Sequence, residues 1–266
     1  MPSSAPLEPA RLEALLASQP LWEKVEWVAS TGSTNADLAA RARSDAETGV
    51  VRISEEQTAG RGRFDRRWES PAGACVACSL LLRPSQPSLA WGWLSLLTGM
   101  AVATGVERAT GAEPGRVQLK WPNDVLLDGK KICGILSERV ESEHGAAAVV
   151  GFGINVSLEA DEIPVPTGTS LRLAGLDQDK TTLMAEILTE FARLYQLWER
   201  DGEVHDEYQW RCSSVGAPLR VMVDEQTQVL GTGHSVDEYG RLVVRTPQGL
   251  QAFSAGDVFH LRLQQA

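Results

Sequence analysis

A short basic segment holds the residues best suited to chemistry. Within eight residues it carries two glycines and four arginines: Gly60, Arg61, Gly62, Arg63, Arg66 and Arg67. Glycine lets the backbone approach a ligand closely, and a guanidinium can fork onto phosphate or carboxylate oxygens. No Gly-Lys-Ser/Thr follows, so the segment is not a Walker A loop. It predicts an anion-binding loop, although a solvated basic loop would look the same by itself.

A second group of residues lies at a tight turn and the strand that follows it. The turn reads Lys-Trp-Pro-Asn-Asp over residues 120–124, and Lys131 and Gly134 begin the next strand. A lysine at the mouth of a strand can neutralise a carboxylate and a phosphoryl oxygen together, and Gly134 leaves room for a flat ligand. Strand alternation predicts that Lys131 and Cys133 share one face, with Ile132 and Gly134 on the other. A hairpin with a surface lysine is the simpler alternative.

Residues 33–35, Ser-Thr-Asn, are predicted to open a helix. Thr34 and Asp37 have the spacing of a capping box. The free N–H groups of a helix N-terminus can also bind a polar ligand, so the two interpretations are compatible.

Two further motifs are weaker than they look. Residues 151–155, Gly-Phe-Gly-Ile-Asn, lack the third glycine of a dinucleotide-binding fingerprint, and a strand continues through Val156. Cys75 and Cys78 form a CxxC inside an apolar strand, where residues three apart point to opposite faces, and no second ligand pair accompanies them. We interpret both cysteines as core residues, and the four histidines as structural or exposed.

Composition narrows the class of protein. The 266 residues are 43% hydrophobic and 23% charged, as in an ordinary globular protein of one or two domains. A net charge of −10 disfavours a general nucleic-acid binder. No signal peptide and no membrane span are recognised, and four cysteines fit a reducing compartment. We therefore expect a cytoplasmic protein that binds neither DNA nor membranes.

Periodicity predicts an α+β fold. Helices are expected over residues 10–17, 33–46, 91–106 and 181–198. Strands are expected over residues 24–29, 50–54, 74–82, 117–120, 124–127, 131–140 and 147–156, and four short ones over 218–223, 226–236, 242–246 and 251–254. Residues 55–73 are expected to form a long loop. The predicted organisation is a tail with a short helix (1–24), a mixed-sheet catalytic domain (25–211) and a small β-barrel-like domain (212–266).

Five motifs, in order and spacing, resemble the catalytic domain of biotin–protein ligases. They read STGSTN, QTAGRGR, KWPNDV, GKKICGIL and GFGINVS, and the resemblance covers about residues 25–157. The C-terminal β segment, which ends in SAGDVFHLR, resembles the small SH3-like domain of that family. The resemblance implies a class II synthetase-like catalytic domain. It also implies a biotin–[acetyl-CoA-carboxylase] ligase that uses ATP and Mg²⁺, with no direct protein ligand to the metal.

The resemblance also implies a biotin site. Ser33, Thr34 and Asn35 would hold the polar ureido ring, and Gln57 would hydrogen-bond biotin or its carboxylate. Gly134 would border the biotin. The loop that closes over biotin and the phosphates would contain Arg61, Gly62 and Arg63.

A nucleotide site is implied by the same motifs. Trp68 would pack over the adenine, and Asn155 would lie near the nucleotide. Lys131 would contact both the biotin carboxylate and the α-phosphate, and would act in catalysis with Arg61 and Arg63. Asp124 is a candidate for the base that takes a proton from the acceptor lysine.

Two residues depart from the family pattern. Asp65 stands where glycine is common, which predicts a stiffer and less electropositive loop. Cys133 replaces a small residue that is common in the family, which leaves the volume of the pocket open.

The implied partner is the biotin carboxyl carrier domain of a carboxylase. A lipoate–protein ligase, a biotin-responsive repressor and an inactive ligase-like domain are the alternatives. The repressor is disfavoured because only about 24 residues precede the catalytic domain, too few for the helix-turn-helix that it needs.

Overall fold

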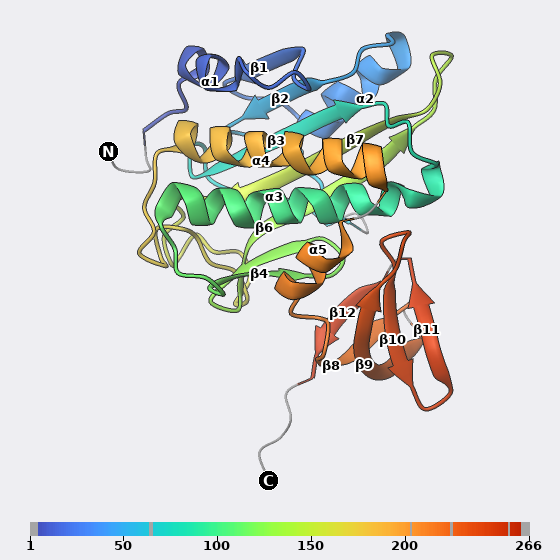
Figure 1. Cartoon of the computed structure of the whole chain (residues 1–266). Coiled ribbons are helices and arrows are strands. Elements are labelled where there is room, and N and C mark those ends of the chain that lie inside the picture. Colours follow the sequence, from blue (N-terminus) through green and yellow to red (C-terminus); the bar gives the residue numbers. More distant parts are fainter. Residues whose placement is uncertain (1–4, 64–65, 203, 224–225, 255, 262–266) are drawn as a thin grey trace.

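The computed structural model describes residues 5–63, 66–202, 204–223, 226–254 and 256–261. The prediction about Asp65 lies outside the described residues. The expected α+β class is confirmed: a seven-stranded mixed sheet with helices on both faces is followed by a separate five-stranded antiparallel sheet (Figure 1).

The large sheet has the strand order β1-β2-β3-β7-β6-β5-β4. Its strands are β1 (Lys24–Val28), β2 (Val50–Ser54), β3 (Cys75–Leu82), β4 (Val117–Lys120), β5 (Asp124–Leu127), β6 (Lys130–Val140) and β7 (Ala147–Asn155). β1 and β2 run parallel, and every other neighbouring pair in this sheet is antiparallel. β3 and β7 are buried along their whole length, because helices cover both faces of the sheet.

Two long helices cover one face of the sheet and a shorter one covers the other (Figure 1). α3 (Gly92–Thr110) and α4 (Lys180–Asp201) lie side by side and form the main core with the sheet. A Cβ on Gly105 of α3 would lie 2.5 Å from Ile187 of α4, so this glycine sets how closely the helices pack. α1 (Pro9–Leu16) packs against α4, and α2 (Thr34–Ser44) packs against the opposite face of the sheet.

Among the described residues, one helical segment, Ser88–Thr110, is long and apolar enough to cross a membrane by length and composition alone. Of its most apolar stretch, 72% is buried inside the protein, where α3 packs against the sheet and against α4. The apolar character of this segment is therefore explained by its place in the core. The helix also runs four residues beyond the predicted end, to Thr110, and is closed by Gly111, which has a φ of +69°.

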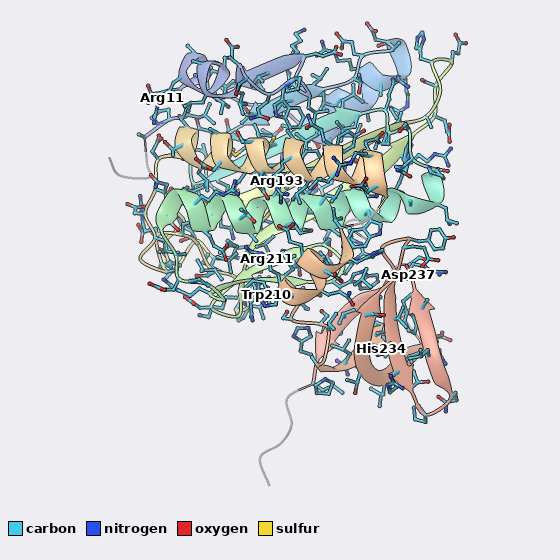
Figure 2. All side chains as sticks on the ribbon, in the orientation of Figure 1. Arg11, Arg193, Trp210, Arg211, His234 and Asp237 are labelled. Atoms are coloured by element: carbon cyan, nitrogen blue, oxygen red, sulfur yellow. The ribbon has the colours of Figure 1, made fainter. Side chains whose placement is uncertain are left out.

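The five-stranded sheet has the order β11-β10-β9-β8-β12. Its strands are β8 (Pro218–Met222), β9 (Gln228–Val236), β10 (Leu242–Thr246), β11 (Gly249–Phe253) and β12 (Asp257–His260). Two elements of this region were missed: β12 and the short helix α5 (His205–Arg211). α5 is tied to α3 by Arg211, whose guanidinium lies 2.7 Å from Glu107 (Figure 2). Both elements are too short for a clear periodic signal.

The predicted alternation along β6 is wrong at its start. Val125 pairs with Cys133 but Leu126 pairs with Lys131, so Ile132 is an extra residue without a cross-strand partner. This bulge reverses the alternation, because two residues of β6 span one step of β5. Ile132 and Cys133 both enter the core, whereas Lys131 and Gly134 come to the same side of the sheet.

Candidate active site

A cavity of about 600 Å³ opens where α2, the 55–73 loop, β6, β7 and β12 meet. It is lined by each of the eleven site residues expected from the sequence: Ser33, Thr34, Asn35, Gln57, Arg61, Gly62, Arg63, Trp68, Lys131, Gly134 and Asn155. Asp124 lines it as well. The structure therefore brings together residues that lie up to about 120 positions apart in the chain.

Uncharged polar side chains meet at one end of the cavity. The backbone N–H and the hydroxyl of Thr34 donate to Gln57 Oε1, at 2.9 and 3.1 Å. Asn35 Nδ2 donates to the carbonyl of Leu136, at 3.1 Å, and Ser79 Oγ of β3 lies 2.6 Å from Asn35 Oδ1. These groups hold one another in fixed orientations, which suits recognition of an uncharged polar ring.

The start of α2 differs from the capping box that was predicted. The helix is capped by Ser33, whose Oγ accepts from the N–H of Ala36 at 3.4 Å. The carboxylate of Asp37 accepts instead from the hydroxyl of Thr31, at 2.8 Å. Because the cap lies one residue earlier, Thr34 is released from capping and its hydroxyl points to Gln57.

Arg61 is held by a carboxylate, that of Glu138, which no motif in the sequence marks. Its guanidinium lies 3.1 Å from both oxygens of Glu138 on β6, and Glu138 also accepts from Asn35 Nδ2 at 2.8 Å. With nearly half of its side chain exposed, Arg61 can exchange this partner for an anionic ligand. Glu138 lies four residues beyond Gly134, so alternation along the rest of β6 could have identified it.

Arg63 links the loop to two other parts of the molecule. Its Nη1 donates to Asn123 Oδ1, at 3.4 Å, and to the carbonyl of Gly256, at 3.3 Å. Asn123 belongs to the turn before β5, and Gly256 precedes β12 of the small sheet. Arg63 therefore stands where the loop, the large sheet and the small sheet meet.

Two glycines form a flat floor in the middle of the cavity. Gly134 of β6 and Gly153 of β7 are direct cross-strand partners, and the indole of Trp68 lies over both. A Cβ on Gly153 would lie 2.6 Å from the ring of Trp68, and one on Gly134 would lie 3.1 Å from it. The room that Gly134 was expected to leave for a flat ligand is therefore taken by the indole of Trp68 in this structure.

Lys131 is the cation nearest to this floor. Its Nζ lies 2.5 Å from Asp124 Oδ1 and about 3.0 Å from the position that a Cβ on Gly134 would take. Its backbone is fixed by Thr167, whose carbonyl accepts from Lys131 N at 2.8 Å. Lys130 is exposed and does not line the cavity, as expected for a neighbouring residue on the opposite side of the strand.

Asn155 lies at the end of β7 and is almost entirely buried. Its Nδ2 donates to the carbonyl of Thr169, at 2.9 Å, and its Oδ1 lies 3.3 Å from Cys75 Sγ. Burial raises the pKa of the Cys75 thiol to about 11, so it stays neutral beside the amide. Cys78 lies in the main core, which agrees with the interpretation of this pair as packing residues.

The concern about Cys133 is answered by its position. The side chain lies in the core and does not line the cavity, so it takes no volume from the pocket. Burial raises the pKa of its thiol well above the usual range.

Other parts of the wall could not be found from the sequence. The segment 164–168 covers Lys131, and Val258 and Phe259 reach the cavity from β12. Neither segment has a charge pattern or a periodicity that marks it. Their contribution depends on how the chain returns to the sheet after β7 and β11.

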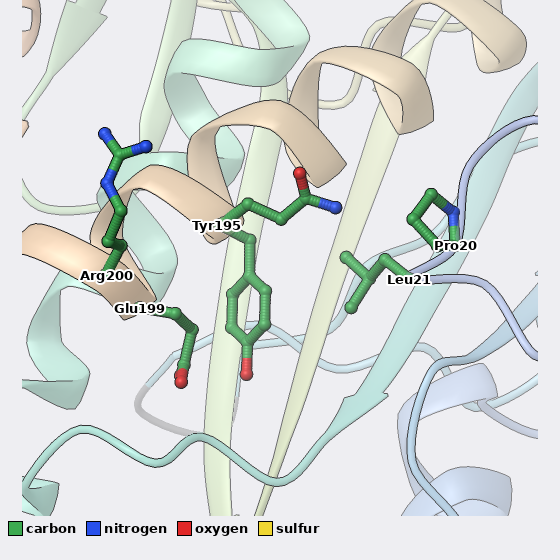
Figure 3. Close-up of a pocket in the computed structure, with 6 residues that line it drawn as sticks. Pro20, Leu21, Tyr195, Glu199 and Arg200 are labelled. Atoms are coloured by element: carbon green, nitrogen blue, oxygen red, sulfur yellow. The ribbon is translucent and has the colours of Figure 1, made fainter.

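A second hollow, of about 420 Å³, lies between α4 and the segment before β1 (Figure 3). It is lined by Pro20, Leu21, Tyr195, Gln196, Glu199 and Arg200. It holds no cluster of convergent charges and none of the expected site residues. Among the described residues, no group of three or more histidines, cysteines or carboxylates is placed to hold a metal ion.

Comparison with known proteins places this chain in one class of protein. The biotin/lipoate A/B protein ligase family matches residues 27–155, and the biotin protein ligase C-terminal domain matches residues 222–261. A biotin–[acetyl-CoA-carboxylase] ligase of Mycobacterium tuberculosis is 38% identical, over 91% of this chain and 90% of its own. One of Paracoccus denitrificans is 33% identical, over 87% and 98%. The chain belongs to the biotin protein ligase family.

A solved structure has the same fold. Biotin protein ligase from Aquifex aeolicus, in complex with biotin and ATP, superposes with a TM-score of 0.75 at 24% identity, over 91% of this chain and all of that one. The bifunctional ligase/repressor BirA of Escherichia coli is 32% identical, over 85% of this chain and 70% of its own.

Proposed function

We propose that this protein is an ATP-dependent biotin–protein ligase. It forms biotinyl-5′-AMP from biotin and ATP, then transfers biotin to a lysine of the biotin carboxyl carrier domain of a carboxylase. The observation that carries the proposal is the position of Lys131. Its ammonium borders the glycine floor, in one cavity with Arg61, Arg63 and the neutral network around Asn35.

The arrangement of charge fits the two ligands. The neutral end around Thr34, Asn35 and Gln57 offers fixed donors and acceptors, as the ureido ring of biotin requires. The cations that line the cavity, Lys131, Arg61 and Arg63, suit a carboxylate and phosphates, which repel each other unless cations lie between them. Trp68 offers an aromatic face on the floor for the adenine ring.

In the first step, a carboxylate oxygen of biotin attacks the α-phosphorus of ATP. An O–P bond forms, the bond to the bridging oxygen of the β-phosphate breaks, and pyrophosphate leaves with the electron pair. Negative charge on the phosphoryl oxygens is stabilised by Lys131, Arg61 and Arg63. Asp124 holds Lys131 beside the floor until the anionic ligands arrive.

In the second step, the amine of the acceptor lysine attacks the carbonyl carbon of biotinyl-AMP. An amide bond forms, and AMP leaves from the acyl carbon. The amine must lose a proton, and Asp124 is the candidate acceptor at the cavity wall once Lys131 has turned to the phosphate. The closed loop keeps water from hydrolysing the mixed anhydride.

Mg²⁺ belongs to the nucleotide in this proposal. Asp124 is the acidic side chain closest to Lys131 in the cavity, and its carboxylate is already paired. A divalent ion therefore fits best as the complex with ATP, where it offsets phosphate charge. The protein's own cations supply the rest of the stabilisation.

Three further assignments belong to the proposal. The domain boundary falls between residues 211 and 212, where the chain passes from α5 towards β8. The protein works in the cytoplasm, which fits four buried cysteines that form no disulfide. It does not bind DNA or membranes as part of this activity, which fits the net charge of −10.

The test is a two-step assay with purified protein, ATP and Mg²⁺. Biotin should release pyrophosphate and yield biotinyl-AMP, and addition of a carrier domain should yield biotinylated carrier and AMP. Lipoate in place of biotin, and a carrier whose acceptor lysine is replaced, are the controls. Turnover with lipoate but not with biotin would show that the protein is a lipoate–protein ligase. No turnover with either compound would reject the ligase assignment.

A further inference from the structure

Lys180, at the start of α4, is a buried charge that the proposed reaction does not use. The structure describes all five lysines of the chain, and Lys180 alone is buried, with 1% of its surface exposed. It also occupies the first turn of a helix, where the helix dipole disfavours a cation. A fully buried lysine and a cation in the first turn of a helix are both unusual, and such departures from general rules concentrate at functional positions.

The contacts of Lys180 join the two ends of the loop over the cavity. Its Nζ lies 2.5 Å from Glu55 Oε1 and donates to the carbonyl of Gly73, at 2.6 Å. Glu55 is the first residue after β2, and Gly73 is two residues before β3. Gly73 N also donates to the carbonyl of Glu55, at 3.0 Å. One ammonium therefore closes the base of the loop that carries Gln57, Arg61, Arg63 and Trp68.

Other contacts make this base rigid. The second oxygen of Glu55 accepts from Leu7 N, at 3.1 Å, so the segment before α1 is attached to the same carboxylate. Asp179, beside Lys180, caps α4 and pairs with Arg11 of α1, at 2.9 Å. Figure 1 shows α1 beside the end of α4 at which that helix begins. The loop is thus anchored to a helix that belongs to the main core.

We propose that Lys180 and Glu55 are positioning residues for the ligand-binding loop. Their buried ion pair holds Glu55 and Gly73 together, so that the two ends of the loop are fixed beside the cavity before ligands arrive. The pair touches no substrate. It acts through the loop, and this inference rests on the proposed function only for its kinetic consequences.

The expected consequence is a looser loop without a change in chemistry. If the clamp is removed, the two ends of the loop must also be brought together during each binding event, so the KM for biotin should rise more than kcat falls. A charge-assisted contact of this kind corresponds to an increase of about tenfold in KM. The intermediate should also escape, which raises the ratio of free biotinyl-AMP to biotinylated carrier.

The test uses the full-length protein with two variants. Lys180→Met leaves the Glu55 carboxylate buried and unpaired, which can unfold the protein by itself. The double variant Glu55→Gln with Lys180→Met removes both charges, keeps an acceptor for Leu7 N and should fold. Amide hydrogen exchange over residues 56–72 should be faster in the double variant than in the wild type, without any substrate present.

Glu190→Gln is the matched control. Glu190 is 1% exposed, lies on the same helix and pairs with Arg108 and Arg193, at 2.9 and 2.6 Å. This variant should lower the unfolding midpoint without changing loop exchange, KM for biotin or leakage. A double variant with wild-type exchange and leakage would overturn the clamp. Wild-type protein that makes no biotinyl-AMP would reject the proposed function, whereas the exchange result would still decide the clamp.

Discussion

At the residue scale, the site depends on small differences between neighbours in the chain. Lys131 borders the cavity and Lys130 is exposed, although both belong to β6. Gly134 and Gly153 leave space that an alanine would fill, and Trp68 uses that space. Substitutions at these positions therefore separate a role in the site from a general effect on the fold.

Lys131→Ala should reduce adenylate formation by a factor on the order of a hundred to a thousand, because a cation about 4 Å from a developing charge contributes roughly 3–4 kcal/mol. Lys131→Arg should not restore activity, since a planar guanidinium cannot replace a compact ammonium beside Asp124. Pyrophosphate release at saturating ATP is the measurement, and Lys130→Ala is the control, with activity near that of the wild type. Loss of activity in the Lys130→Ala variant would show that the Lys131 side chain has been assigned to the wrong side of the sheet.

Gly153→Ala should weaken nucleotide binding. Its Cβ would lie 2.6 Å from the indole of Trp68, so the ring must leave the glycine floor. Loss of an aromatic contact worth about 0.5–1.5 kcal/mol corresponds to a rise in the KM for ATP of about two- to tenfold. Gly32→Ala is the control, because a Cβ there meets nothing within 4 Å. Equal KM values for the two variants would remove Trp68 from the nucleotide site.

At the element scale, the position of the site depends on how β1, β2 and α2 are joined. Glu26 of β1 accepts from Lys24, from Arg41 of α2 and from Arg52 of β2, at 2.7 to 3.1 Å. This network holds α2, the helix capped by Ser33, beside β2, the strand that leads to Gln57. Burial by itself would raise the pKa of Glu26, but hydrogen bonds and charges from Lys24 and Arg41 lower it to about 2.

A lowered pKa gives a signed prediction for stability. The folded protein holds Glu26 ionised down to about pH 2, whereas the unfolded chain protonates it near the ordinary value of 4.5. The stabilisation is therefore present above about pH 4.5 and is lost as the pH falls towards 2. Glu26→Gln should lower the free energy of unfolding by about 1–2 kcal/mol at pH 7. Urea unfolding at several pH values should show this difference shrink towards pH 2, and a difference independent of pH would contradict the network.

At the scale of the whole molecule, the two sheets share the cavity. Val258 and Phe259 of the small sheet line it, and Arg63 of the loop reaches the carbonyl of Gly256. The sheets are held together by two buried tryptophans, because Trp93 Nε1 donates to Glu238 O and Trp121 Nε1 donates to Gly240 O, at 3.1 and 3.0 Å. The site is therefore complete only when the small sheet is docked.

Trp121→Phe should loosen this docking. It removes the donor to the buried carbonyl of Gly240 and leaves that carbonyl without this partner, which costs about 1–3 kcal/mol. Thermal unfolding should begin earlier, and the KM for ATP should rise with it. Trp210→Phe is the control, since Trp210 is 74% exposed on α5 (Figure 2) and its loss should be nearly neutral. Equal midpoints for the two variants would show that Trp121 does not hold the sheets together.

The sequence by itself determined the chemistry of this protein and most of its elements. Gly, Arg and Lys in fixed local spacing predicted the loop and the strand of the site, and apolar periodicity located the long helices and the strands of the large sheet. These signals are local: they depend on residues a few positions apart, which the backbone places together in any fold. The class of fold and the family followed from them.

Only the tertiary structure decided how these parts meet. The bulge at Ile132 moved Lys131 and Gly134 to one side, and it arises from the pairing of β6 with β5. Glu138 near Arg61, Phe259 at the cavity and Lys180 beneath the loop are contacts between distant segments. Such contacts are selected by packing and by the need to pair buried charges, and neither leaves a periodic trace in the sequence.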